Sequence, residues 1–259
     1  MTFWDHLDEL RGVIIKILIA IVVLMIISFL FKEEVFSIVL APKESGFVLY
    51  QLLQRAAEGM GIESFHLENF NIELISTQLA SQFITHMKVA FSCGILLASP
   101  YILYQVLRFV TPALYENERH YAVPVVAWSY ALYIIGLLLS YFVIFPLAIR
   151  FLGTYQVSAD VPNLITLDSY ISTFITLSLL MGLMFELPVL CWLFAKLGFI
   201  TAGFLRHYRR HAFVIILIAG AVITPTADIF TLLLVSIPIY ILYEVSIGVV
   251  AVGARKIRE

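Results

Sequence analysis

Long apolar runs separated by short polar segments dominate the chain. A helix needs roughly 20 apolar residues to cross a bilayer, and four runs meet that length. They are residues 12–31, 84–107, 121–149 and 168–195. A fifth apolar region, 212–254, contains Asp228 and Glu244, so hydropathy alone does not fix the number of crossings within it.

The distribution of lysine and arginine indicates how many times the fifth region crosses the membrane. These residues collect on the cytoplasmic side of membrane proteins, and the segments before 212 and after 254 are both rich in them. The region between them must therefore cross twice, with the turn signal Thr224-Pro225 at the outer hairpin. We predict six transmembrane helices with both termini cytoplasmic, the last two being short spans at 212–227 and 228–250.

This topology places eleven of the 16 Lys and Arg residues inside the cell. They lie in five segments that the prediction makes cytoplasmic or places at the inner ends of spans. These residues are Arg11, Lys16, Arg108, Arg119, Lys196, Arg206, Arg209, Arg210, Arg255, Lys256 and Arg258. The cytoplasmic segments are an amphipathic helix at 1–11, loops at 108–120 and 196–211, and a tail at 251–259, while 150–167 is an outer loop.

The largest extramembrane segment, 32–83, is predicted on the outer side. It holds seven Glu against three Lys and Arg, which gives a net charge of −4. Apolar residues at helical spacing predict a helix from Val48 to Ala56 that Gly59 ends, and the alternation around Ile72 and Leu74 predicts a short extended piece. We favour a cap that covers the outer ends of the spans, and docking of a partner is the alternative.

Composition supports the membrane assignment and excludes several classes. The 259 residues are 61% hydrophobic and 13% charged, with a mean hydropathy of +0.98, too little polar material to cover a soluble domain. Cys93 and Cys191 both lie inside apolar runs, so no disulfide framework or metal cage is implied. We expect one all-α polytopic membrane domain over residues 1–259, with no metal, no cofactor and no nucleic-acid partner.

Two groups of carboxylates are expected on the cytoplasmic face. Glu9 follows Asp5 and Asp8 in the N-terminal segment, and Glu118 follows Glu116 in the loop 108–120. Two adjacent carboxylates suit a pair of guanidinium groups, because the planar fork of arginine binds a carboxylate through two hydrogen bonds. The alternative is internal pairing, and both remain open. The internal pairs would join Glu9 to Arg11 or Arg119, and Glu118 to Arg108 or Lys16.

Glu186 lies inside the fourth apolar run. A carboxylate at that depth costs roughly 2.5–3.5 kcal/mol on insertion scales, so a functional role is the first hypothesis. Pro188 lacks an N–H and frees the carbonyl of Met184, which adds polarity and favours a polar groove. The alternative is a buried Glu186 bonded to Ser, Thr or Tyr of a neighbouring span. Asp228 is expected to cap the sixth span.

Enzyme signatures are absent. The chain has no Gly-x-Ser-x-Gly motif and no glycine-rich phosphate loop, and none of its six His lies deep in a span. We therefore expect a non-enzyme. An ion-coupled secondary transporter that uses Glu186 is an alternative function, although such folds favour internal repeats and the two halves show none.

Five blocks of the sequence resemble one family along nearly the whole chain. They are Phe3-Trp4-Asp5-His6-Leu7-Asp8-Glu9-Leu10-Arg11; Pro100 to Val106 with Phe109, Pro112-Ala113-Leu114-Tyr115 and Glu118-Arg119; Tyr141 to Pro146; Phe185-Glu186-Leu187-Pro188; and Thr224-Pro225 with Asp228. Together they resemble the TatC family, the receptor subunits of twin-arginine protein translocases. The outer segment 43–80 is the divergent part.

The resemblance implies a concave, glove-like arrangement of six helices in a bacterial inner membrane. It implies a receptor for twin-arginine signal peptides of folded precursors, which nucleates an export complex with TatA/TatB-type single-span proteins and other copies of itself in the lipid bilayer. It implies a signal-peptide site at Glu9, Phe109, Leu114, Glu118 and Arg119. It further implies an intramembrane polar groove at Glu186 and Pro188, and a partner surface at Thr224, Asp228, Thr231 and Glu244.

Overall fold

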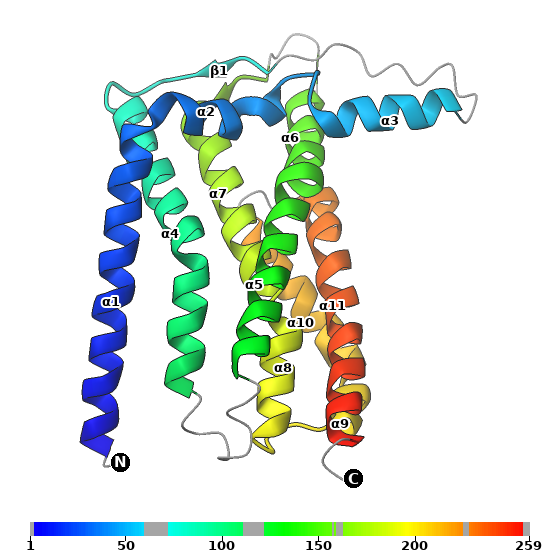
Figure 1. The fold of residues 1–259 in the computed structure, drawn as a ribbon. Helices are drawn as coiled ribbons and strands as arrows, with labels where there is room; N and C mark the ends of the chain where they lie inside the picture. The colour runs from blue at the N-terminus through cyan, green and yellow to red at the C-terminus, as the bar shows by residue number, and fades with distance from the viewer. Residues whose placement is uncertain are drawn as a thin grey trace.

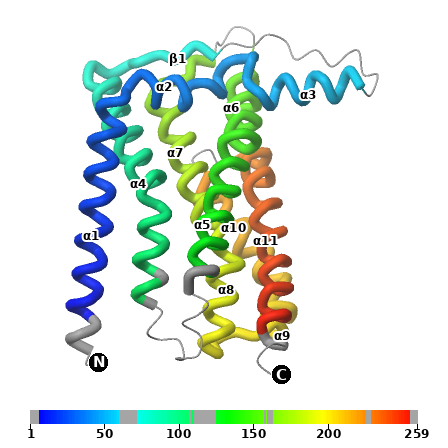
Figure 2. The backbone as a smooth tube through the Cα atoms, viewed as in Figure 1, coloured from blue at the N-terminus to red at the C-terminus, as the bar shows by residue number. Residues whose placement is uncertain are grey.

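The long helices form one bundle, and both chain termini lie at the same end of it (Figure 1). A computed structural model describes residues 3–59, 72–110, 122–156, 158, 163–224 and 228–255. We call the end with the termini the terminal end. We call the opposite end, crossed by α2 (Lys32–Leu40) and α3 (Val48–Gly59), the cap end. The backbone trace shows α2 and α3 lying across the axes of the long helices (Figure 2).

The first two long helices form an antiparallel pair. They are α1 (Phe3–Leu30) and α4 (Ser81–Val110), and α1 packs mainly on α4. A Cβ atom built on Gly94 would lie only 2.9 Å from the carbonyl oxygen of Ile21, so the two backbones touch there. Residues 3–11 of the predicted N-terminal helix are helical, and they continue without a break into the first span as one helix, α1.

The third span is a helix with a wider turn in the middle. It consists of α5 (Ala122–Leu139), a π-helical turn η4 (Ser140–Ile144) and α6 (Phe145–Thr154). Pro146 occupies the first turn of α6, where its missing N–H is tolerated. The helix continues to Thr154, into the segment we predicted as an outer loop.

The fourth span is broken at Phe185 and Glu186, between α7 (Leu167–Met184) and α8 (Leu187–Lys196). Pro188 lies in the first turn of α8, as its fixed φ favours. Helical hydrogen bonding reaches into the break, because the Phe185 N–H donates to the Met181 carbonyl at 3.0 Å.

The last region contains α9 (Ala202–His207), α10 (Arg209–Ile223) and α11 (Ile229–Arg255). With 15 residues α10 is short, as predicted, whereas α11 has 27 residues and is longer than we predicted. It continues to Arg255, beyond the predicted end at residue 250. Glu244 lies inside it, with the Arg209 guanidinium 2.7 Å from its carboxylate.

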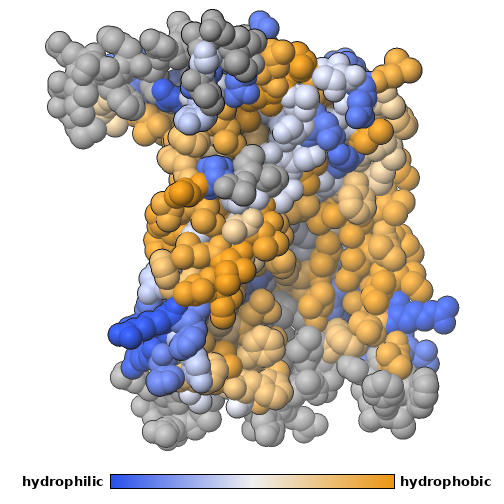
Figure 3. Space-filling model, turned by 180° about the vertical axis from the view of Figure 1, so that it is seen from behind, coloured by the Kyte–Doolittle hydropathy of each residue, from blue (hydrophilic) through white to orange (hydrophobic). Residues whose placement is uncertain are grey.

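Among the described residues, five helical stretches are long and apolar enough to cross a membrane. They are Leu7–Leu30, Ser81–Val106, Val125–Thr154, Leu167–Lys196 and Ile229–Gly253. The helix α10 is shorter than a full crossing, so the count of six spans remains a prediction. From behind, apolar atoms form a wide band around the middle of the molecule, and hydrophilic atoms gather near both ends (Figure 3).

The cap is held to the spans by tyrosine hydroxyl groups. Besides α2 and α3 it contains a short 3₁₀ helix η1 (Ala41–Lys43) and a strand β1 (Leu74–Ile75), which pairs in parallel with β2 (Ile165–Thr166). The predicted helix and extended piece are therefore confirmed. The Tyr170 hydroxyl donates to the Val39 carbonyl at 3.1 Å, and the Tyr141 hydroxyl donates to the Ile38 carbonyl at 2.8 Å.

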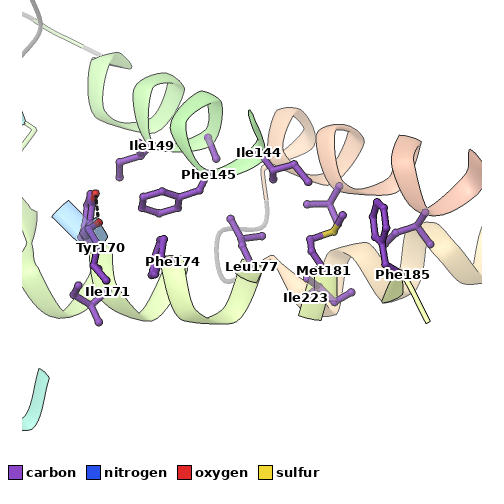
Figure 4. Packing of buried hydrophobic residues seen from close by; sticks show 14 of the residues in the cluster. Ile144, Phe145, Ile149, Tyr170, Ile171, Phe174, Leu177, Met181, Phe185 and Ile223 are labelled. Atoms are coloured by element: carbon purple, nitrogen blue, oxygen red, sulfur yellow. Dashed lines mark hydrogen bonds between the residues drawn. The ribbon is translucent and has the colours of Figure 1, made fainter. Parts of the chain in front are cut away.

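The core lies where α6 and η4 meet α7. Phe145 packs edge-to-face on Tyr170 and Phe174, with ring centroids 5.0 and 5.1 Å apart. Leu177 and Met181 continue this row toward the terminal end, where α10 and α11 close it (Figure 4). This core places the break in the fourth span at a fixed depth in the bundle.

Replacing Tyr50 by phenylalanine is expected to loosen the cap. The buried Tyr50 hydroxyl lies 2.9 Å from the Pro146 carbonyl and 3.2 Å from the Pro42 carbonyl, so one donor joins α3 to α6 and η1. Burial raises the pKa of Tyr50, and nearby Arg150 only partly opposes this, so the hydroxyl keeps its proton. We expect Tyr50→Phe to cost about 1–3 kcal/mol.

Thermal unfolding in detergent measures this cost. The control is Tyr155→Phe, because the Tyr155 side chain is exposed. An unchanged unfolding temperature for Tyr50→Phe would show that the hydroxyl does not hold the cap.

Candidate functional site

The terminal end brings together the beginning of α1 with the end of α4 (Figure 1). Glu9 and Arg11 are exposed in the first turns of α1. Arg108 is exposed and Phe109 half-buried in the last turn of α4. The first of the two predicted carboxylate groups therefore lies at the same end of the bundle as Arg108 and Phe109. That the two carboxylate groups share one face of the membrane remains a prediction.

The contact at Gly94 fixes the relative height of these residues. Glu9 stands 12 residues before Ile21, and Phe109 stands 15 residues after Gly94, on a helix that runs the opposite way. At a rise of 1.5 Å per residue, their positions along the bundle differ by about 5 Å. The packing of α1 on α4 thus sets Glu9 and Phe109 at nearly the same level on adjacent helices.

Three predicted members of this site lie outside the described residues. They are Leu114, Glu118 and Arg119. The helices on either side of them, α4 and α5, both have their nearer ends at the terminal end (Figure 1). The role of these three residues remains a prediction.

Glu186 lies in the packed junction of three spans. Its side chain is buried, and the Ser129 hydroxyl of α5 donates to its Oε2 at 2.5 Å. Tyr133, one turn further along α5, forms a side-chain hydrogen bond with Ser99 of α4 and interacts electrostatically with Glu186. The structure therefore shows the alternative left open by the sequence, a buried carboxylate bonded to a serine of a neighbouring span, and the groove role remains a prediction.

Two glycines make this junction possible. A Cβ built on Gly136 of α5 would lie 2.8 Å from the Met181 carbonyl oxygen, and one on Gly182 of α7 would lie 2.7 Å from the Tyr133 ring. Small residues at these points let α5 and α7 approach closely. Sequence reasoning found Glu186 but missed Ser129, because a serine in a charge-free run gives no sign of its partner.

The predicted partner surface is divided between buried and accessible residues. Thr224 is 4% exposed and Thr231 is 0% exposed, so both face the interior. Asp228 accepts a hydrogen bond from the Thr231 N–H at 2.7 Å, which confirms that it caps α11. Glu244 is about one-third exposed and is paired with Arg209, a pairing that the sequence did not reveal. Only Asp228 and Glu244 are accessible for direct contact.

Comparisons with known proteins agree with this geometry. The family model described as "Sec-independent protein translocase protein (TatC)" matches residues 5–238. Proteins of that name from Blattabacterium sp. subsp. Periplaneta americana and from Aquifex aeolicus are each 34% identical to this chain, over 99% and 100% of it and 97% and 98% of their own lengths. The Escherichia coli K12 protein is 33% identical over 93% of this chain and 85% of its own length.

A solved structure extends the likeness to the fold. A crystal structure described as the twin arginine translocase receptor TatC superposes with a TM-score of 0.76, at 32% identity, over 96% of this chain and 99% of that one. The predicted all-α membrane fold is confirmed. Because the family model and near-full-length relatives both match, this chain belongs to the TatC family of Sec-independent protein translocase proteins.

Proposed function

We propose that this chain is the receptor that binds twin-arginine signal peptides in a Sec-independent translocase, and that the binding site lies at the terminal end. The observation that carries the proposal is that Glu9 and Phe109 lie at nearly the same level on adjacent helices. An acidic side chain and an aromatic ring at that level suit a guanidinium group followed by an apolar segment. Glu118 supplies the second carboxylate in this proposal.

The arginines and the apolar run of the signal peptide contribute different amounts of binding free energy. A partly exposed ion pair contributes about 1 kcal/mol or less, and a bidentate arginine–carboxylate pair contributes more. Burial of the apolar run adds roughly 0.8 kcal/mol per methylene, although the lipid bilayer offers part of that gain elsewhere. The arginines therefore supply selectivity, and the apolar run supplies much of the affinity.

Photo-crosslinking tests the location of the site. An aromatic photoreactive amino acid in place of Phe109, which keeps a ring at that position, should crosslink to a precursor with an Arg-Arg signal and not to the same precursor with Lys-Lys. The control position is Ile26, which is exposed on α1 toward the cap end. Equal crosslinking from Ile26, or no preference for Arg-Arg, would place the site elsewhere.

For the translocase partners we propose the outer surface of α10 and the start of α11. Ile215, Ile218 and Val222 are exposed along one face of α10, at the spacing of a helix-packing stripe. The cap at Asp228 fixes the start of α11. Single-span TatA/TatB-type proteins match a surface of this kind, with Thr224 and Thr231 buried behind it.

Replacing Glu186 by glutamine separates the receptor from the alternative, an ion-coupled transporter. A proton carrier needs the carboxylate to titrate, so Glu186→Gln would abolish all its activity. A receptor should retain precursor binding, because glutamine has the same size and its oxygen still accepts from Ser129. Binding to isolated membranes is the measurement, with Glu186→Leu as the variant that removes the acceptor and costs about 1–3 kcal/mol of stability.

A further inference from the structure

An apolar pocket lies between three helices in the half of the bundle near the terminal end. Its volume is about 290 Å³. The side chains around it come from α5, α8 and α11, and none of them carries a charge. They are Val125, Trp128 and Leu132 of α5, Pro188, Val189 and Trp192 of α8, and Val249 of α11.

The break in the fourth span creates this pocket. On the cap side of the break, α5 packs closely on α7 through Gly136 and Gly182. On the terminal side, α5 touches α8 only sparsely, whereas α11 packs extensively on α8. The space left between α5 and α8 is the pocket, and Trp128, 70% exposed, stands at its edge.

Positive charge lies at the rim of the pocket nearest the terminal end. The Lys196 ammonium, at the end of α8, is 5.9 Å from the centroid of the Trp192 ring. A Cβ built on Gly253 of α11 would be 3.5 Å from the same indole ring.

The size of the pocket restricts what can enter it. A helix with its side chains is about 10–12 Å across, too wide for a space of 290 Å³. A methylene group is about as large as a water molecule, whose share of liquid volume is about 30 Å³. A single hydrocarbon chain of roughly ten methylenes therefore fits.

We propose that the pocket binds one anionic phospholipid from the leaflet at the terminal end. One acyl chain fills the space between α5 and α8, and the phosphate lies beside Lys196 at the end of α8. Basic pockets between transmembrane helices bind anionic head groups by this combination of charge and apolar surface. A lysine at this depth reaches the head-group region while its own stem covers apolar surface.

Fluorescence quenching by brominated lipids tests the proposal. The chain has three tryptophans, so Trp4→Phe and Trp128→Phe leave Trp192 as the reporter. The protein is placed in phosphatidylcholine bilayers that contain either brominated phosphatidylglycerol or brominated phosphatidylcholine at the same fraction. We expect Trp192 to prefer the anionic lipid by roughly fivefold, the effect of one lysine near the surface.

Variants identify the two parts of the site. Lys196→Gln should abolish the preference and Lys196→Arg should keep it, while Val189→Phe should reduce quenching by both lipids because it fills the pocket. A matched protein with all three tryptophans replaced by phenylalanine and Ile19→Trp, on the exposed face of α1, reports ordinary surrounding lipid.

Equal quenching of Trp192 by the two brominated lipids, as for Ile19→Trp, would overturn the proposal and leave only surrounding lipid. Absence of quenching by either lipid would also overturn it, since the pocket would then be closed to the bilayer or filled by protein. Both results are independent of precursor binding, so the test stands apart from the proposed receptor function.

Discussion

Glu118→Arg is expected to abolish binding of twin-arginine precursors while the protein still inserts into the membrane. The substitution removes one carboxylate and places a positive charge against the incoming guanidinium groups. A hydrogen bond to a charged group contributes about 1.5–3 kcal/mol, which corresponds to a loss of affinity between about tenfold and a hundredfold. Repulsion adds to that loss, so export should fall below detection.

The measurement is crosslinking of an Arg-Arg precursor to the variant in membranes, with the amount of inserted protein determined in parallel. Glu33→Arg is the matched control, because it reverses an exposed carboxylate at the cap end. Glu9→Arg should weaken crosslinking as well, and the double variant should bind no better than Glu118→Arg alone. Full binding by Glu118→Arg would refute the assignment of this carboxylate.

The positions of the spans could be predicted from the sequence because the hydrocarbon core of a bilayer restricts which structures can cross it. A helix in hydrocarbon must satisfy its own backbone and present apolar side chains outward, so runs of apolar residues map directly onto α4, α5 and α7. The cap helix was also predictable, because its apolar residues repeat at helical spacing and Gly59 ends it. These features depend on local sequence alone.

Contacts between distant residues could not be predicted in the same way. Ser129 and Glu186 are 57 positions apart, and Arg209 and Glu244 are 35 apart. Nothing in either local sequence specifies the partner, since each pair depends on how two helices are placed.

The pocket beside α8 depends both on the break in the fourth span and on how α5 packs around that break. Pro188 predicted a disturbance of the fourth span, and the structure places the break at Phe185 and Glu186. Whether such a break opens space depends on the neighbouring helix. Here α5 packs closely on α7 and makes few contacts with α8. Pro188, next to the break, could be singled out from the sequence, but the side chains that line the pocket could not, because they come from three helices.

Gly94→Val is expected to separate α1 from α4 and so to remove half of the proposed site. The Cβ and its two methyl groups would meet the backbone of α1, which lies 2.9 Å away at the Ile21 carbonyl and 3.1 Å away at the Met25 Cα. Backbone cannot move aside as a flexible side chain can, and such overpacking costs about 1–3 kcal/mol. Because α1 packs mainly on α4 and is apolar along most of its length, it should stay in the membrane but shift away.

The shift predicts two linked losses. Spin labels at Arg11→Cys and Arg108→Cys, in a background with Cys93 and Cys191 replaced by alanine, should show a longer and broader distance distribution in Gly94→Val. Precursor crosslinking from Phe109 should fall in parallel, because Glu9 is no longer level with it. Gly248→Val on α11 is the control, since a Cβ there meets nothing within 4 Å. A lengthened label distance with undiminished precursor binding would show that Glu9 and Phe109 need not act together, and the receptor site would then have to be built from α4 and the segment that follows it.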